Sequence, residues 1–521
     1  MRAAESSAAT ATATAAPVKS GAGAKYLTVS ALGFTTAASI VTSLRGLPMM
    51  AKEEMTMFFY IGFSTLLFLI PAGLVAAELG SMYANKAGGL YAWISGAFGK
   101  KVGFAIIFLS WIQVIVFYPT GMSFAAAGVA FAFDRPDIAQ NHVYVGIFAI
   151  VAFWLCTAVA FVSNQFALKV TRWGFLAGTA LPGIILVLVF VWWISTGHSI
   201  GWEHTTNPSV TVDHSGHDSP RFFPYIAGLS GLSFLAGILL NFAGVESQGV
   251  HSTELKNPAK GYPAAIMIAA AVAFGIFTLG ALAVAGIVAY DQIDLNTGVF
   301  DAFTIAFTEM IHSSWPVRIL SALIAYGALA GVLAWILGPS RGVLATAHDG
   351  MLPPVLQKVN GRGVQTNILI IQGIIVTALS SIYLFMDDVS SAFFLISAMA
   401  VSLYLIIYMV MYAAAIRLRY TRPDLPRAFE IPGGTVGMWL FAGTGFLAVA
   451  FAFVLAFVPP EQLPIGNPAT YIALVAGGAI VFSAVPLIIE RMKKPSWIPP
   501  ADVKAKALGP SADTSHLSNA G

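Results

Sequence analysis

Long apolar segments recur along the whole chain, and they constrain the fold more than any other feature of the sequence. Of its 521 residues, 57% are hydrophobic and only 10% are charged, whereas a soluble domain carries about 25% charged residues. About 20 apolar residues cross a bilayer as an α-helix, and no segment alternates with the period of a barrel strand. The sequence therefore predicts an all-α membrane protein with twelve transmembrane helices, over about 28–50, 57–78, 102–131, 143–163, 173–197, 225–250, 263–290, 316–346, 365–386, 389–415, 434–458 and 469–490.

The basic residues in the loops predict the orientation of these helices. If the N-terminus is cytoplasmic, 21 of the 27 Lys and Arg fall in the cytoplasmic loops and tails. Such an excess is the usual mark of the cytoplasmic side. We therefore expect a multi-pass protein of the plasma (inner) membrane with both termini in the cytoplasm.

The first apolar segment contains a charged residue beside two helix-breaking residues. Arg45 is followed by Gly46 and Pro48, and an arginine near the bilayer centre costs roughly 2.5–3.5 kcal/mol on insertion scales. Gly and Pro both weaken a helix. A broken helix with a cation at its break is typical of a ligand site.

The sixth segment repeats this pattern, with Gly244 and Glu246 in its middle. Interrupted helices at matching positions of two halves are typical of transporters built from inverted repeats. Free N–H groups at such a break attract a carboxylate, and unwound carbonyls attract an ammonium group. Glycines that only permit close helix packing are the alternative explanation.

Several features exclude other classes of protein. The single cysteine, Cys156, rules out a disulfide framework and a multi-cysteine metal site, and the net charge of +3 spread over membrane loops gives no reason to expect nucleic acid. We find no zinc-protease, phosphate-loop or nucleophile-elbow motif, so we expect no enzyme activity, cofactor or metal. The loop 198–224 carries four histidines and three acidic residues. Such a loop could bind a metal ion or sense pH, but we favour the alternative of an ordinary solvated loop.

Motifs spread along the chain resemble the amino acid/polyamine/organocation (APC) superfamily. They are Gly88-Gly89-x-Tyr91-x-Trp93, Phe242-x-Gly244-x-Glu246, Glu254-x-x-Asn257-Pro258 and Gly338-Pro339-Ser340-Arg341-Gly342. Within this superfamily the chain is most similar to the bacterial glutamate/γ-aminobutyrate antiporters. The residues that carry this similarity are Arg221-Phe222-Phe223-Pro224, Trp335 to Gly342, Tyr404, Tyr408 and Phe429-x-Ile431-Pro432-Gly433-Gly434.

The resemblance implies a LeuT-like fold with alternating access around a central site. It assigns a transporter domain to residues 25–490, with one five-helix repeat at about 28–197, an inverted second repeat at about 225–415 and two extra helices at 434–490. We expect the polar tails 1–24 and 491–521 to be disordered. The sequence leaves self-association open.

The family geometry implies the roles of the backbone groups in the candidate site, and the chemistry of the side chains indicates the rest. Backbone groups of Ser43, Leu44 and Gly46 would hold the substrate carboxylate, and those of Asn241, Phe242 and Ala243 the ammonium group. Arg45 would bind a carboxylate through its planar fork, or pair with Glu246. Further expected contacts come from an aromatic cover and from hydroxyls on one face of the tenth helix, namely Trp335, Phe242, Tyr404 and Tyr408.

Two charged residues are candidates for gating or proton coupling. Glu246 would take a proton or, alternatively, make a fixed hydrogen bond to unwound backbone. Arg341 would pair across the cytoplasmic gate, with Glu78 as one candidate partner, or extend to the lipid headgroups.

The sequence departs from the antiporter pattern in the first and eighth helices. Arg45-Gly46-Leu47 replaces an aromatic-acidic-aromatic run, and Gly331 stands in place of an acidic residue. Losing an acid and gaining a cation favours a substrate with more negative charge. We therefore predict an antiporter for an acidic or neutral, glutamate-like amino acid. A proton-coupled amino acid symporter is the alternative, and a non-transporting amino acid sensor a remote one.

Overall fold

The computed structural model describes residues 28–83, 89–162, 164–204, 222–224, 228–246, 255–361, 364–386, 388–464 and 467–498. Within these ranges every regular element is helical. The predicted tail 1–24, most of the histidine-containing loop and the C-terminal residues 499–521 lie outside the described residues.

Ten helices of the described part are long and apolar enough to cross a membrane, as the composition predicted. Six of these spans are single helices: α6 (Lys100–Ala132), α8 (His142–Val162), α13 (Pro258–Ile287), α15 (Trp315–His348), α18 (Val389–Thr421) and α21 (Pro468–Arg491). The other four spans each contain two α-helices. They are Glu54–Met82, with α3 (Met57–Phe63) and α4 (Ile70–Met82); Lys169–Ser195, with α9 (Asn164–Phe175) and α10 (Leu181–Ser195); Thr366–Phe385, with α16 (Thr366–Ser380) and α17 (Ile382–Phe385); and Gly434–Leu455, with α19 (Gly434–Met438) and α20 (Thr444–Leu455).

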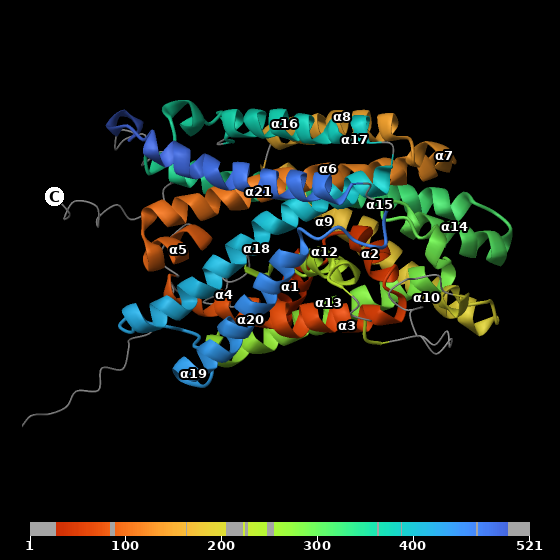
Figure 1. Cartoon of the computed structure of the whole chain (residues 1–521), viewed down its shortest axis with the longest axis horizontal. Helices are drawn as coiled ribbons and strands as arrows, with labels where there is room; N and C mark the ends of the chain where they lie inside the picture. The colour runs from red at the N-terminus through yellow and green to blue at the C-terminus, as the bar shows by residue number, and fades with distance from the viewer. Residues whose placement is uncertain are drawn as a thin grey trace, which may run out of the picture.

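The first and sixth predicted segments differ from these ten spans, because each contains short apolar helices instead of one long helix. The first consists of α1 (Val29–Ile40) and α2 (Leu47–Ala51), and the sixth begins with Ser230–Asn241, which includes α12 (Phe234–Asn241). In Figure 1 the labels α1, α2 and α12 lie near the middle of the molecule, between the long helices α18 and α13. The broken segments thus occupy the interior, where unpaired backbone groups are shielded from lipid.

The long helices enclose these short ones by close packing. α6 lies along α15 and α18, and α1 lies along α13. At one crossing the approach is too close for a side chain, because a Cβ added at Gly178 would lie 2.3 Å from the carbonyl oxygen of Leu323 on α15. Such small-residue contacts are the usual way in which membrane helices gain packing energy.

Three helices were not predicted: α5 (Leu90–Phe98), the short α7 (Pro136–Ala139) and α14 (Gly298–Ile311). α14 buries Val299, Phe300, Phe303 and Ala306 on one face, and it joins two spans that the sequence analysis connected by a loop.

The C-terminal segment also differs from its prediction. Residues 491–498 were expected to be disordered, but Pro495–Trp497 form a helical turn. The carbonyl of Trp497 accepts a 2.7 Å hydrogen bond from Nε2 of Gln357, and Ile498 packs against Gly350. The chain is therefore anchored on the segment that follows α15.

Candidate functional site

The predicted break in the first segment is present in the structure. α1 ends at Ile40, Ser43 is extended (φ −161°, ψ 168°), and a short helical turn over Leu44–Gly46 leads into α2. The β-branched residues Val41 and Thr42 favour leaving the helix, and Pro48 fits the first turn of a new one. The break therefore lies directly before Arg45.

The second break follows α12 and touches the first. Gly244 has a φ of +109°, which favours glycine, and the chain leaves the helix after Asn241. A Cβ added at Gly46 would lie 2.3 Å from Oδ1 of Asn241. The two breaks therefore meet at a contact that only a glycine permits.

Arg45 is buried at this meeting point, and none of the described residues gives it a carboxylate partner. Arg45 is 6% exposed, and its Nη1 donates a 2.9 Å hydrogen bond to Oγ1 of Thr120. The guanidinium carbon lies 4.3 Å from the ring centre of Phe117 and 5.3 Å from that of Phe393. Hydroxyl and ring contacts stabilise a cation, but among the described residues no acid lies within ion-pair distance of Arg45.

Glu246 has other partners, so the alternative of an Arg45–Glu246 ion pair is wrong for this structure. The hydroxyl of Tyr404 donates to its Oε1 at 2.5 Å, and the hydroxyl of Tyr408 donates to its Oε2. The N–H of Gly244 donates to both Glu246 Oε2 and the Tyr408 oxygen, each at 3.1 Å. This is the arrangement of a carboxylate that fixes unwound backbone, and a role in gating or proton coupling stays a prediction.

A cavity of about 50 Å³ lies where the breaks meet. Six of the ten residues predicted to bind substrate line it: Ser43, Arg45, Asn241, Ala243, Trp335 and Tyr404. Its volume suits a water molecule rather than an amino acid, so the surrounding helices must separate before a substrate enters. Gly46 lines a smaller adjoining cavity with Arg45, and Tyr408 contacts the break through Gly244 and Glu246.

The predicted aromatic cover from Phe242 is wrong. Its side chain is fully buried and packs edge-on against Phe277, with ring centres 4.8 Å apart. Phe277 lines the cavity instead. Leu44 faces a separate apolar groove between the first segment, α10 and α13, so only its backbone can serve the site.

The sequence analysis missed the contribution of α6. Gln113, Phe117 and Thr120 occupy positions i, i+4 and i+7 of this helix and thus share one face. Gln113 and Phe117 line the cavity, and Phe117 and Thr120 contact Arg45. Gln113 and Thr120, two polar residues seven positions apart in a mostly apolar helix, are the signal that could have revealed this face.

The cytoplasmic pair suggested between Arg341 and Glu78 is also wrong. Glu78 accepts from Arg419 (2.6 Å), Arg427 (3.1 Å) and the N–H of Ile431 (2.9 Å). Arg341 is exposed on α15, which is compatible with the alternative of contact with lipid headgroups. The buried ion cluster connects α4 to the end of α18 and the loop after it.

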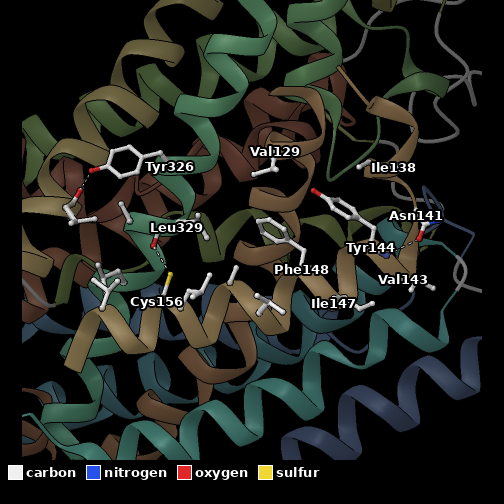
Figure 2. A pocket seen from close by; sticks show the side chains of 17 residues that line it. Val129, Ile138, Asn141, Val143, Tyr144, Ile147, Phe148, Cys156, Tyr326 and Leu329 are labelled. Atoms are coloured by element: carbon white, nitrogen blue, oxygen red, sulfur yellow. Dashed lines mark hydrogen bonds between the residues drawn. The ribbon is translucent and has the colours of Figure 1, made fainter. Parts of the chain in front are cut away.

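A groove of about 960 Å³ lies between α8 and α15 and is larger than the central cavity. Figure 2 shows Tyr144, Phe148 and Cys156 of α8 along it, facing Leu329 and Tyr326 of α15. Its lining carries no charged side chain, and α8 residues such as Ile147 and Leu155 are exposed. An apolar, open groove on a membrane-spanning helix suits lipid chains and gives a zwitterion no charged partner.

Metal binding by the histidine-containing loop finds no support in the part of the loop that is described. The described residues contain no group of three His, Cys, Asp or Glu side chains that could hold a metal ion. His198 stacks on Trp193, with ring centres 4.4 Å apart, and hydrogen-bonds the Thr196 hydroxyl at 2.7 Å.

Comparisons with known proteins agree with this architecture. An uncharacterized transporter of Legionella pneumophila is 34% identical over 451 residues, covering 87% of this chain and 94% of its own. A glutamate/γ-aminobutyrate antiporter of Lactococcus lactis is 29% identical over 461 residues, covering 88% and 89%. A solved manganese transporter of Eremococcus coleocola superposes with a TM-score of 0.50 at 14% identity, covering 91% and 97%, which supports the helical transporter fold alone.

A family model described as amino acid permease matches residues 25–481. The chain therefore belongs to the amino acid permease family, within the APC superfamily of transporters.

Proposed function

We propose that this protein is an antiporter of the plasma membrane that exchanges an acidic, glutamate-like amino acid for a related amino acid or amine by alternating access. The observation that carries the proposal is Arg45, a buried cation at a helix break whose described neighbours include no carboxylate. A substrate carboxylate would supply the missing charge through a bidentate hydrogen bond. Relatives named glutamate/γ-aminobutyrate antiporters support exchange between such molecules.

The rest of the site would hold the α-amino acid group. Backbone N–H groups of Ser43, Leu44 and Gly46 would bind the α-carboxylate, and carbonyls of Asn241, Phe242 and Ala243 would bind the α-ammonium. Trp335, which lines the cavity, would cover the substrate. In this proposal twelve transmembrane helices form two inverted five-helix repeats, at about 28–197 and 225–415, plus two extra helices, with both termini cytoplasmic.

Contacts at both ends of the molecule support alternating access. Beyond α2, Nζ of Lys52 donates to the carbonyls of Tyr290 and Ile293, at 3.4 and 2.9 Å. At the other end, the Glu78 cluster connects α4 to the loop after α18. With both sets of contacts formed, the central cavity is too small for an amino acid. Breaking one set at a time would open the site to one side.

Exchange and proton-coupled symport are separated by counterflow in proteoliposomes. We expect labelled glutamate to enter only when an amino acid or amine is present inside, at equal pH on both sides. Uptake without internal substrate, driven by a pH gradient, would support the symporter instead, with Glu246 as the candidate proton carrier because its carboxylate accepts hydrogen bonds from two tyrosine hydroxyls. Exchange with no member of a panel of amino acids and their decarboxylation products would refute the proposal.

A further inference from the structure

Gln113 is a buried polar side chain in the wall of the central cavity, and nothing in the family assignment gives it a role. It lies on α6 and is 3% exposed. Its Oε1 has no hydrogen-bond partner among the described residues. Leaving a buried amide oxygen unpaired costs about 1–3 kcal/mol. Such a cost at a cavity wall indicates that the group pairs with a ligand that enters the cavity.

The position of Gln113 relative to Arg45 indicates which end of a ligand it meets. Arg45 contacts Phe117 and Thr120 of α6. With a rise of 1.5 Å per residue, Gln113 lies about 6 Å from Phe117 and about 10 Å from Thr120 along the helix axis. The side chains of Arg45 and Gln113 line the same cavity. A small amino acid that places its anionic group on Arg45 therefore extends toward Gln113.

We propose that Gln113 is a specificity-determining residue, whose carboxamide, together with the backbone groups of the two breaks, hydrogen-bonds the polar group of the substrate farthest from Arg45. This inference rests on the proposed exchange function. A carboxamide carries no net charge and holds both a donor and an acceptor. Its NH₂ group donates to a carboxylate, and after a half-turn about its last torsion its oxygen accepts from an ammonium group. One neutral side chain thereby accepts both a carboxylate-ended and an ammonium-ended partner of the exchange.

Two substitutions of similar size separate this role from packing. Gln113→Met keeps the length and removes the hydrogen bonds, and Gln113→Glu keeps the shape and adds a charge that repels a carboxylate but attracts an ammonium. The control is Gln372→Met on α16. Gln372 is another fully buried glutamine, and its Nε2 also has no hydrogen-bond partner among the described residues, but its Oε1 accepts a 2.8 Å hydrogen bond from Nε1 of Trp111 and it does not line the central cavity.

The measurement is counterflow in proteoliposomes with glutamate and γ-aminobutyrate as probes, each at a range of concentrations. We expect Gln113→Met to raise the apparent KM of both probes about tenfold, the loss of one hydrogen bond. We expect Gln113→Glu to raise the KM of glutamate about a hundredfold relative to that of γ-aminobutyrate, as for a site that rejects an unpaired charge. Gln372→Met should keep the wild-type ratio.

An unchanged ratio of the two KM values in Gln113→Glu would overturn the inference while leaving the proposed function intact. Failure of the wild-type protein to exchange any amino acid refutes the proposed function instead. If a variant inserts but does not transport, protection by each probe against thermal unfolding in detergent gives the binding ratio. Equal protection of wild type and Gln113→Glu by both probes overturns the inference as well.

Discussion

The buried ion cluster around Glu78 of α4 gives a prediction whose magnitude follows from its geometry. Glu78 is the acid between Arg419 and Arg427, at N–O distances of 2.6 and 3.1 Å. Its side chain is 2% exposed, and those of the two arginines are 6% and 9% exposed. Glu78→Gln keeps the shape and removes the negative charge. Glu430 also pairs with Arg419, but its side chain is 57% exposed.

Removing one partner of a buried ion pair costs about 3–5 kcal/mol, because the remaining charges stay buried without compensation. We expect a value near the lower end, since Glu430 continues to neutralise part of the Arg419 charge. The matched control is the surface pair of Lys101 and Glu490, at 3.0 Å with Lys101 78% exposed. Lys101→Met should cost less than about 1 kcal/mol.

The assay is thermal unfolding of the purified protein in detergent, followed as the fraction that remains monodisperse in size-exclusion chromatography. We expect the midpoint of Glu78→Gln to fall by about 5 °C or more, and that of Lys101→Met to stay within about 2 °C of wild type. Equal midpoints for Glu78→Gln and wild type would refute the conclusion that this cluster stabilises the folded protein.

Two further substitutions test the contact between the two helix breaks and a buried acid, Glu53, that follows α2. Gly46→Ala places a Cβ 2.3 Å from Oδ1 of Asn241, so counterflow should fall at least about tenfold, the effect of about 1–3 kcal/mol of overpacking. The control is Gly62→Ala, which has open space at its Cβ and should transport normally. Equal counterflow rates for Gly46→Ala and Gly62→Ala would contradict the contact between the breaks. Burial raises the pKa of Glu53 to about 8. The folded state therefore binds this proton more tightly than the unfolded state, and its contribution to stability is lost as pH rises from about 4.5 to 8. Glu53→Gln should flatten this part of the unfolding-temperature profile between pH 5 and 8, and a slope equal to that of wild type would show that Glu53 is not the group responsible.

The helical membrane fold and the two breaks were predictable because their causes are local. Segment length and composition determine which stretches cross the bilayer. Gly46, Pro48 and Gly244 mark where a helix cannot continue at low cost. The structure places these breaks against each other, as the pattern indicated, and six predicted residues line the resulting cavity.

Contacts between distant segments could not be predicted in the same way. Thr120 and Phe393 meet Arg45 from helices far away in the sequence. Helices that are apolar on every side give no periodic signal for which face turns inward. Apart from Gln113 and Thr120, α6 gives little such signal, so its inward face was missed, and Phe242 was assigned to the cavity although Phe277 takes that place. The partner of Glu78 was wrong for the same reason.

The role of Arg45 is tested most directly by comparing exchange of acidic and neutral amino acids in Arg45→Met, an apolar side chain of similar length. Charged hydrogen bonds contribute about 1.5–3 kcal/mol, so we predict that glutamate counterflow falls about a hundredfold while exchange of a neutral amino acid falls less than about tenfold. Arg318→Met is the control, since Arg318 lies at the exposed start of α15 and hydrogen-bonds the carbonyl of Ala132. If Arg45→Met inserts normally and exchanges glutamate at the wild-type rate, Arg45 does not bind the substrate carboxylate.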